Sequence, residues 1–277
     1  MKFLGIDFSG NAASWKASRT RSNVWICRVE SDHNSKPQVV ALQTVQQLPG
    51  QSAPYEKLAD LLASKRFAAA AIDAPFSLPQ RYVPADGWLE LLRKVHALDL
   101  AGNVPFPSGQ ALIALAESIA ELEQLKPLRL TEKYWLEQRV NVRSTLWWKP
   151  RGGAPFAAAC MKLLAMAKFP PCWPWTNAEQ GLIAEAFPSA QLQSWKLPYQ
   201  KYDGPQGIEM RRQIIYGLES KSRINFGSFR PAAEQCADAL DAVVASFAGI
   251  AAHYSQATFP IVDRSIVLRE GWIAIHP

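Results

Sequence analysis

The sequence predicts an α/β fold, with a mixed β-sheet flanked by helices and a largely helical insertion. Short segments rich in β-branched and aromatic residues occupy residues 2–8, 23–30 and 37–45, as expected of strands. Residues 53–75 then combine a helical repeat with a further apolar segment. The alanine-rich residues 232–254 have the composition of a long helix.

The N-terminal elements follow from local patterns. The first three segments are joined by short polar links, which predicts a three-stranded meander. Residues 53–67 place apolar side chains on one helical face, which predicts an amphipathic helix. The apolar residues 68–74 stop at Pro75, which lacks the N–H that a strand ladder needs. We therefore expect a strand that ends near Asp73.

The middle of the chain, residues 86–178, predicts a helical subdomain inserted into a single domain of residues 1–277. The segments GWLELLRKVHAL and ALIALAESIAELEQL have helical periodicity, and aromatic and Pro-rich loops follow them. After the insertion, LIAEAFPSAQL returns to a strand pattern that carries Glu185. The segments TFPIVD and GWIAIHP predict a closing hairpin of two short strands.

Composition indicates a globular protein of the cytoplasm that is not bound to a membrane. The 277 residues are 48% hydrophobic and 19% charged, which provides enough apolar side chain for a sizeable core. Asp7 interrupts the first apolar run, unlike a signal peptide, and no run reaches the roughly 18 apolar residues of a membrane helix. The four cysteines form no CxxC motif or Cys/His cluster, so we expect reduced, mostly buried thiols.

The net charge of +6 is concentrated in two stretches. Residues 126–151 and 196–230 each contain seven Lys or Arg residues. Basic regions beside an acidic pocket suit an enzyme that cuts phosphodiesters, because they attract the polyanion. Lys196, Arg211 and Arg212 are therefore candidates for contacts with substrate phosphates, and an ordinary exposed basic face is the open alternative.

Four aspartates are candidates for a catalytic metal site. Asp7 lies within the opening apolar segment, where an ionised side chain without a partner would be costly to bury. Asp73 ends a later strand, and Asp238 and Asp241 project from one face of the last long helix. Converging carboxylates repel one another unless a cation neutralises them, and hard oxygen ligands favour Mg²⁺ or Mn²⁺ over zinc. Two such ions would activate a water for hydrolysis of a phosphodiester.

Four motifs, GIDFSG, AIDAPFSLP, EAFPSA and ADALDAVVASFAG, occur in an order that resembles the signature of the DUF429 family. Members of this family are uncharacterised and are predicted to be RNase H-like nucleases. The resemblance implies an RNase H-like mixed sheet and a metal-dependent nuclease acting on DNA or RNA. It also implies that Asp7 bridges the metals, that Asp73 is the second-strand ligand and that Asp238 or Asp241 is the helical ligand. Glu185 would be a further ligand or a support for one.

The last motif is also similar to the closing helix of Holliday-junction resolvases, where two aspartates complete a metal site. The residue at position 73 is Asp rather than the Glu of the resolvase pattern, so resolvase activity does not carry over.

Other interpretations stay open from the sequence. Asp7 could cap a turn with Ser9 and Gly10, Asp73 could simply end a strand, and the helical pair could face solvent. The protein could be a noncatalytic nucleic-acid-binding or protein-binding module on the same fold. GIDFSG also begins like an actin-like or sugar-kinase-like phosphotransferase, but the single copy of the core and the lack of further glycine-rich loops disfavour that class. Neither G-x-S-x-G nor a P-loop occurs.

Overall fold

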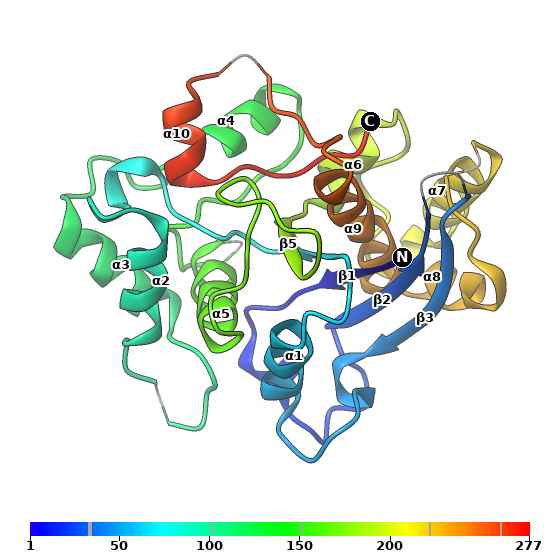
Figure 1. The fold of residues 1–277 in the computed structure, drawn as a ribbon, viewed down its shortest axis with the longest axis horizontal. Helices are drawn as coiled ribbons and strands as arrows, with labels where there is room; N and C mark the ends of the chain where they lie inside the picture. Colours follow the sequence, from blue (N-terminus) through cyan, green and yellow to red (C-terminus); the bar gives the residue numbers. More distant parts are fainter. Residues whose placement is uncertain (33–34, 101, 151, 222, 261) are drawn as a thin grey trace.

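A five-stranded mixed sheet forms the centre of the protein, with strand order β3-β2-β1-β4-β5 (Figure 1). The computed structural model describes residues 1–277 except 33–34, 101, 151, 222 and 261. The strands are β1 (Lys2–Asp7), β2 (Trp25–Glu30), β3 (Gln38–Thr44), β4 (Ala69–Asp73) and β5 (Leu182–Glu185). The first three form the predicted antiparallel meander, and β4 and β5 run parallel to β1. The predicted α/β fold is confirmed, and the arrangement is consistent with an RNase H-like fold.

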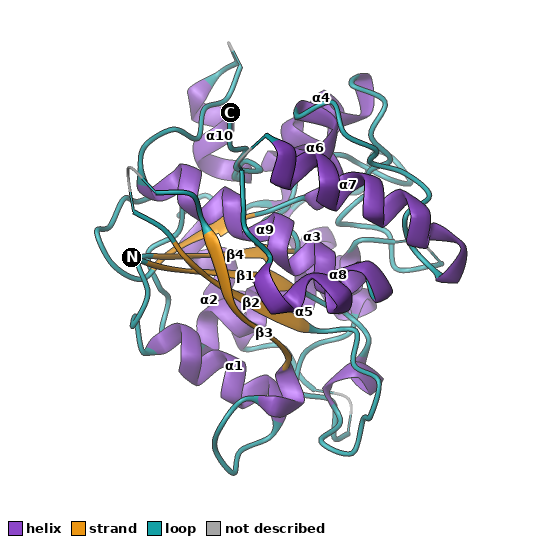
Figure 2. Cartoon of the chain, turned by 90° about the vertical axis from the view of Figure 1, so that its right-hand side faces the viewer, coloured by secondary structure: helices purple, strands orange, loops and turns teal. Residues whose placement is uncertain are grey.

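Helices cover both faces of this sheet, and Figure 2 shows the strands between them. On one face, Ile6 and Ile72 pack in a core shared with α1 (Pro54–Ala63), α2 (Trp88–His96) and α5 (Ala154–Met166). On the other face, alternate strand residues such as Phe3 and Ala71 pack against α6 (Pro188–Ser194), α7 (Ile208–Ser220) and α9 (Ala237–His253). This division follows from the two-residue repeat of a strand, which turns successive side chains to opposite faces.

Helix α9 crosses β1 in direct backbone contact because residue 5 is glycine. A Cβ atom at Gly5 would lie 1.9 Å from the carbonyl oxygen of Ala242 and 2.5 Å from the amide nitrogen of Ser246. Any side chain there would push the helix away from the strand. The close crossing brings the first turns of α9 to the carboxyl end of β1.

The predicted insertion is helical. Its helices are α2, α3 (Gly109–Ile119), α4 (Leu130–Glu137) and α5. Helix α5 packs into the same apolar core as the sheet, and its N-terminus lies against the loop that follows β1. That contact depends on Gly10, where a Cβ atom would lie 2.6 Å from the amide nitrogen of Phe156. The insertion therefore helps to build the region around the end of β1.

Two predictions for the last fifty residues were wrong. The predicted single helix over 232–254 is divided at Cys236, whose extended backbone (φ −130°, ψ 120°) separates α8 (Arg230–Gln235) from α9. The predicted closing hairpin is not formed by the described residues: α10 (Arg264–Glu270) occupies the link between the two predicted strands, and Ile273 of the second forms an isolated parallel bridge with Glu185 instead. The side chain of Asp263 accepts a hydrogen bond from the Ser265 amide, and this N-cap favours a helix over a strand. Residue 261, in the first predicted strand, lies outside the described residues.

The cysteines are mostly buried, as the sequence predicts. Cys27, Cys160 and Cys172 are buried free thiols, and Cys236 is a partly buried one. Within the described part of the chain, no helix combines the length and the apolar composition that crossing a bilayer requires.

Candidate functional site

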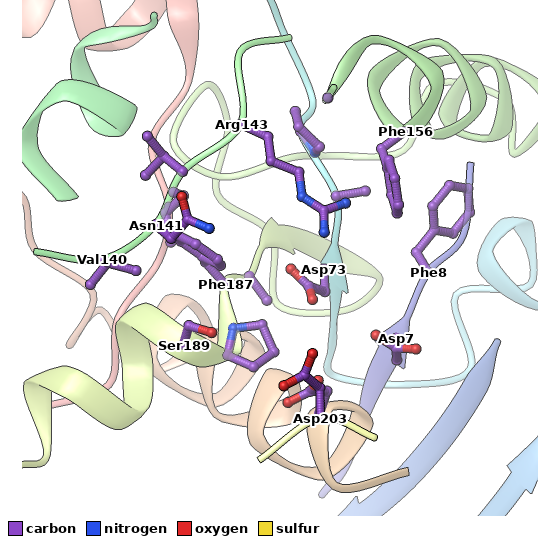
Figure 3. Close-up of a pocket in the computed structure, with 18 of the residues that line it drawn as sticks. Asp7, Phe8, Asp73, Val140, Asn141, Arg143, Phe156, Phe187, Ser189 and Asp203 are labelled. Atoms are coloured by element: carbon purple, nitrogen blue, oxygen red, sulfur yellow. The ribbon is translucent and has the colours of Figure 1, made fainter. Parts of the chain in front are cut away.

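Four aspartates that are remote in the sequence meet at the carboxyl ends of β1 and β4. Asp7 and Asp73 are register partners on these adjacent parallel strands, which lie about 4.8 Å apart. Asp238 and Asp241 come from the first turns of α9. All four line one pocket of about 770 Å³, and Figure 3 shows Asp7 and Asp73 among the side chains that line it. The structure thus brings together the aspartates that the sequence singles out.

The two strand aspartates lie where ionisation is unfavourable. Burial raises the pKa of Asp7 well above its usual range, and the charges of Asp241 and Asp238 add to the rise. Burial also raises the pKa of Asp73 to about 7, a rise that Arg143 opposes. Neither carboxylate receives a hydrogen bond or forms an ion pair from the described residues.

The helical aspartates are each held by a neutral hydrogen-bond donor. The Asn23 amide donates to Asp238 Oδ2 at 3.0 Å, and the Tyr202 hydroxyl donates to Asp241 Oδ1 at 2.7 Å. Burial raises the pKa of both carboxylates, and the charge of Asp73 further raises that of Asp241. Each donor binds one carboxylate oxygen without neutralising the charge. The cluster therefore offers carboxylate oxygens whose ionisation is unfavourable unless a cation is bound, and such oxygens are the ligands that Mg²⁺ and Mn²⁺ prefer.

The aspartate side chains are not arranged around a common point. Among the described residues, no group of three or more His, Cys, Asp or Glu side chains is arranged so that it could hold a metal. Binding would thus require the carboxylates to turn toward a common point.

Glu185, the fifth predicted metal ligand, lines the same pocket but is engaged by other groups. Its register partner is Ile72 rather than Asp73, so the strand repeat turns its side chain to the opposite face from the aspartates. Both of its carboxylate oxygens accept from the Arg129 guanidinium, and Oε2 also accepts from the Phe76 amide. This geometry favours a supporting role for Glu185, which is one of the two roles that the resemblance implies.

Arg129 connects this support to the insertion. It is 1% exposed, and it also donates to Glu132 at 2.9 Å and to the backbone carbonyl of Glu270 at 3.3 Å. One guanidinium thus joins α4, α10 and the end of β5.

We expect Arg129→Met to lower the free energy of unfolding by roughly 3 kcal/mol, because it leaves Glu132 and Glu185 buried without their counter-charge. Urea unfolding measures the loss. The matched control is Arg81→Met, which breaks an ion pair with Glu123 whose side chains are 47% and 60% exposed, and which should cost less than about 1 kcal/mol. Equal losses of unfolding free energy in the two variants would show that the buried ion pairs of Arg129 stabilise the fold no more than an exposed ion pair does.

The three predicted phosphate contacts lie outside the pocket. Lys196 is exposed after α6, and Arg212 is half-exposed between Glu209 and Glu234. Arg211 is 2% exposed and donates to four backbone carbonyls, those of Tyr202, Gly204, Glu234 and Gln235. The structure therefore places Arg211 in the scaffold, where it ties the loop that carries Tyr202 to the C-terminus of α8.

Other residues of the pocket gave no separate signal in the sequence. Arg143 and Lys201 supply positive charge, Asp203 adds an acid, and Tyr202 holds Asp241. Arg143 lies in the first basic stretch, residues 126–151, which the sequence shows to carry excess positive charge. Its position in that stretch does not distinguish it from the neighbouring basic residues. Tyr202 and Asp203 lie in the loop before α7, and the hydrogen bond from Tyr202 to Asp241 connects that loop to α9.

We expect Tyr202→Phe to weaken Mn²⁺ binding by about tenfold, as is typical when the partner of a metal ligand is removed. The hydroxyl lowers the pKa of Asp241, so its loss should also move the onset of binding to higher pH. Titration calorimetry over a pH series measures both effects. Tyr216→Phe, which alters a tyrosine 69% exposed on α7, should leave binding unchanged. An unaltered Mn²⁺ affinity in Tyr202→Phe would contradict the role given to Asp241.

A model of a known protein family matches most of the chain. The DUF429 family, described as a protein of unknown function, matches residues 5–264. No curated protein and no solved structure matches the chain.

Proposed function

The chain belongs to the DUF429 family, and from its carboxylate site we propose that it is a nuclease that hydrolyses phosphodiesters with Mg²⁺ or Mn²⁺. The observation that carries the proposal is the placement of Asp7 and Asp73 as register partners beside Asp238 and Asp241 in one pocket. A structural role explains this poorly, because burial raises the pKa of all four carboxyl groups. A functional role explains the cost if a cation is bound during activity.

The residues of the pocket would have different roles in the reaction. Asp7, Asp73 and Asp241 are the ligands that we expect to hold the ions, with Asp238 at the outer, more accessible side. A bound divalent cation would supply charge stabilisation for the phosphodiester and a water made more acidic. Tyr202 and Asn23 orient the helical carboxylates, and Arg143 offers positive charge on the opposite side of the pocket from α9 (Figure 3).

Conditions inside the cell suit this proposal. The four cysteines are free thiols, as expected of a protein of the cytoplasm, where disulfides are rare. A reaction that depends on Mg²⁺ also suits that compartment. We therefore expect the protein to act there on DNA or RNA.

The test is cleavage of a panel of labelled oligonucleotides, comprising single strands, duplexes and RNA–DNA hybrids. We expect cutting of at least one substrate with Mg²⁺ or Mn²⁺ and none with EDTA. Metal-independent cutting, or no cutting of any substrate by protein that binds Mn²⁺, would overturn the proposal.

A further inference from the structure

One wall of the pocket is apolar, and binding of a metal by the carboxylates does not require such a wall. Val142, Phe187 and Tyr199 line the pocket, are each half-buried, and pack against one apolar cluster. They come from three separate segments: the loop before α5, the start of α6 and the loop before α7. An apolar surface assembled from three segments next to charged groups is typical of a site that holds an amphipathic ligand.

Positive charge lies beside the acids. The Arg143 side chain points toward Asp73 in Figure 3. No ion pair from the described residues engages its guanidinium, which instead lies over the ring of Phe156, 5.3 Å from the ring centroid. An arginine that is positioned but not neutralised by an acid is suited to a phosphate.

The order of these groups matches the parts of one nucleotide. Carboxylates and Arg143 can face the phosphate, and the ring of Phe187 can face the base. The volume of about 770 Å³ lies within the range of roughly 300–1,000 Å³ that small-molecule pockets have. A base paired within a duplex cannot reach Phe187 unless it first leaves the stack.

We propose that the substrate enters this pocket as an unpaired nucleotide, with its phosphate between Arg143 and the carboxylates and its base against Phe187 and Tyr199. The proposal rests on the proposed function in taking the ligand to be a nucleic acid. It assigns single-stranded or splayed nucleic acid as the substrate class, and it assigns Arg143, Phe187 and Tyr199 to substrate binding.

The test is binding rather than cleavage, with Ca²⁺ in place of Mg²⁺. Fluorescence anisotropy compares a labelled oligothymidylate with a dumbbell duplex whose two ends are closed by hexaethylene-glycol linkers, so that it has neither free ends nor unpaired nucleotides. We expect the single strand to bind at least about tenfold more tightly. Phe187→Leu keeps an apolar side chain in the cluster and removes the ring, and it should weaken single-strand binding by about tenfold without altering the thermal unfolding temperature greatly. Tyr199→Leu is the second variant if Phe187→Leu does not fold.

Two control variants match these substitutions outside the pocket. Phe169→Leu alters an aromatic residue 39% exposed beyond the far end of α5, and Arg66→Ala removes an exposed arginine before β4. Both should retain single-strand binding, whereas Arg143→Ala should lose about tenfold. Equal or tighter binding of the dumbbell, absence of single-strand binding, or full binding by both Phe187→Leu and Tyr199→Leu would overturn the inference.

The outcomes for the two proposals are separable. Single-strand binding with the expected losses, but without cleavage in Mg²⁺ or Mn²⁺, would refute hydrolysis and leave the unpaired-nucleotide site standing. Metal-dependent cleavage with a preference for the dumbbell would do the reverse.

Discussion

Replacement of Asp7 by asparagine is expected to lower divalent-cation-dependent cleavage by at least about 1,000-fold. Asp7 is central in the cluster, because the charges of Asp241, Asp238 and Asp73 all act on it. Loss of its charge would weaken the binding of the metal that the strand and helix aspartates are expected to hold together. A loss of about 4 kcal/mol of charge stabilisation in the transition state corresponds to a factor of about 1,000 in rate. Initial rates of oligonucleotide cleavage, measured at saturating Mn²⁺, give the effect.

The control for this variant is Asp60→Asn, which alters an exposed aspartate on α1 and should retain full activity. Asn at position 7 preserves the size of the side chain, so circular dichroism should show an unchanged fold. Cleavage by Asp7→Asn within tenfold of the unaltered protein would place the active site elsewhere.

The second large effect is an increase in the stability of the metal-free protein when Asp73 is replaced by asparagine. The pKa of Asp73 is raised from 3.8 to about 7 in the folded protein. The neutral form is therefore favoured by folding, and this contribution to stability is fully present below about pH 4 and is lost as the pH rises to about 7. At about 1.4 kcal/mol per pH unit, the loss amounts to as much as about 4 kcal/mol.

Asp73→Asn should remove this dependence. Urea unfolding in EDTA should give the two proteins similar free energies of unfolding near pH 4 and a more stable variant near pH 8. Saturating Mn²⁺ should stabilise the unaltered protein more than the variant, because only the former has the full set of carboxylates. A variant that is destabilised equally at both pH values would indicate that Asp73 has a structural role.

Much of the fold could be predicted from local patterns. The meander, the strand that ends at Asp73 and the helical nature of residues 86–178 depend on side-chain alternation, on Pro75 and on helical periodicity, which act over a few residues. The closing segments were predicted less well, because the link between them forms a helix that begins at the N-cap Asp263, and Ile273 pairs with Glu185, which is remote in the sequence, rather than with a hairpin partner. The break at Cys236 likewise has no proline or glycine to announce it.

The residues of the site also include some that the sequence could indicate and some that it could not. Asp7 and Asp73 could be anticipated because strands that run parallel in one sheet end at the same edge. Glu185 shares that edge, but its register partner is Ile72, and register between strands cannot be read from one sequence. Arg211 looked like a phosphate contact because its charge is visible in the sequence, whereas its burial among backbone carbonyls is not. Arg143 and Tyr202 depend on how loops close over the pocket.

Crystals soaked in Mn²⁺ and measured at an anomalous wavelength test the central claim most directly. We expect at least one anomalous peak in contact with carboxylate oxygens of both Asp7 and Asp73, with Asp241 turned toward the same ion. A map that shows no peak there at saturating Mn²⁺, above the pH at which these carboxyl groups ionise, would contradict the claim that the four aspartates form a metal site.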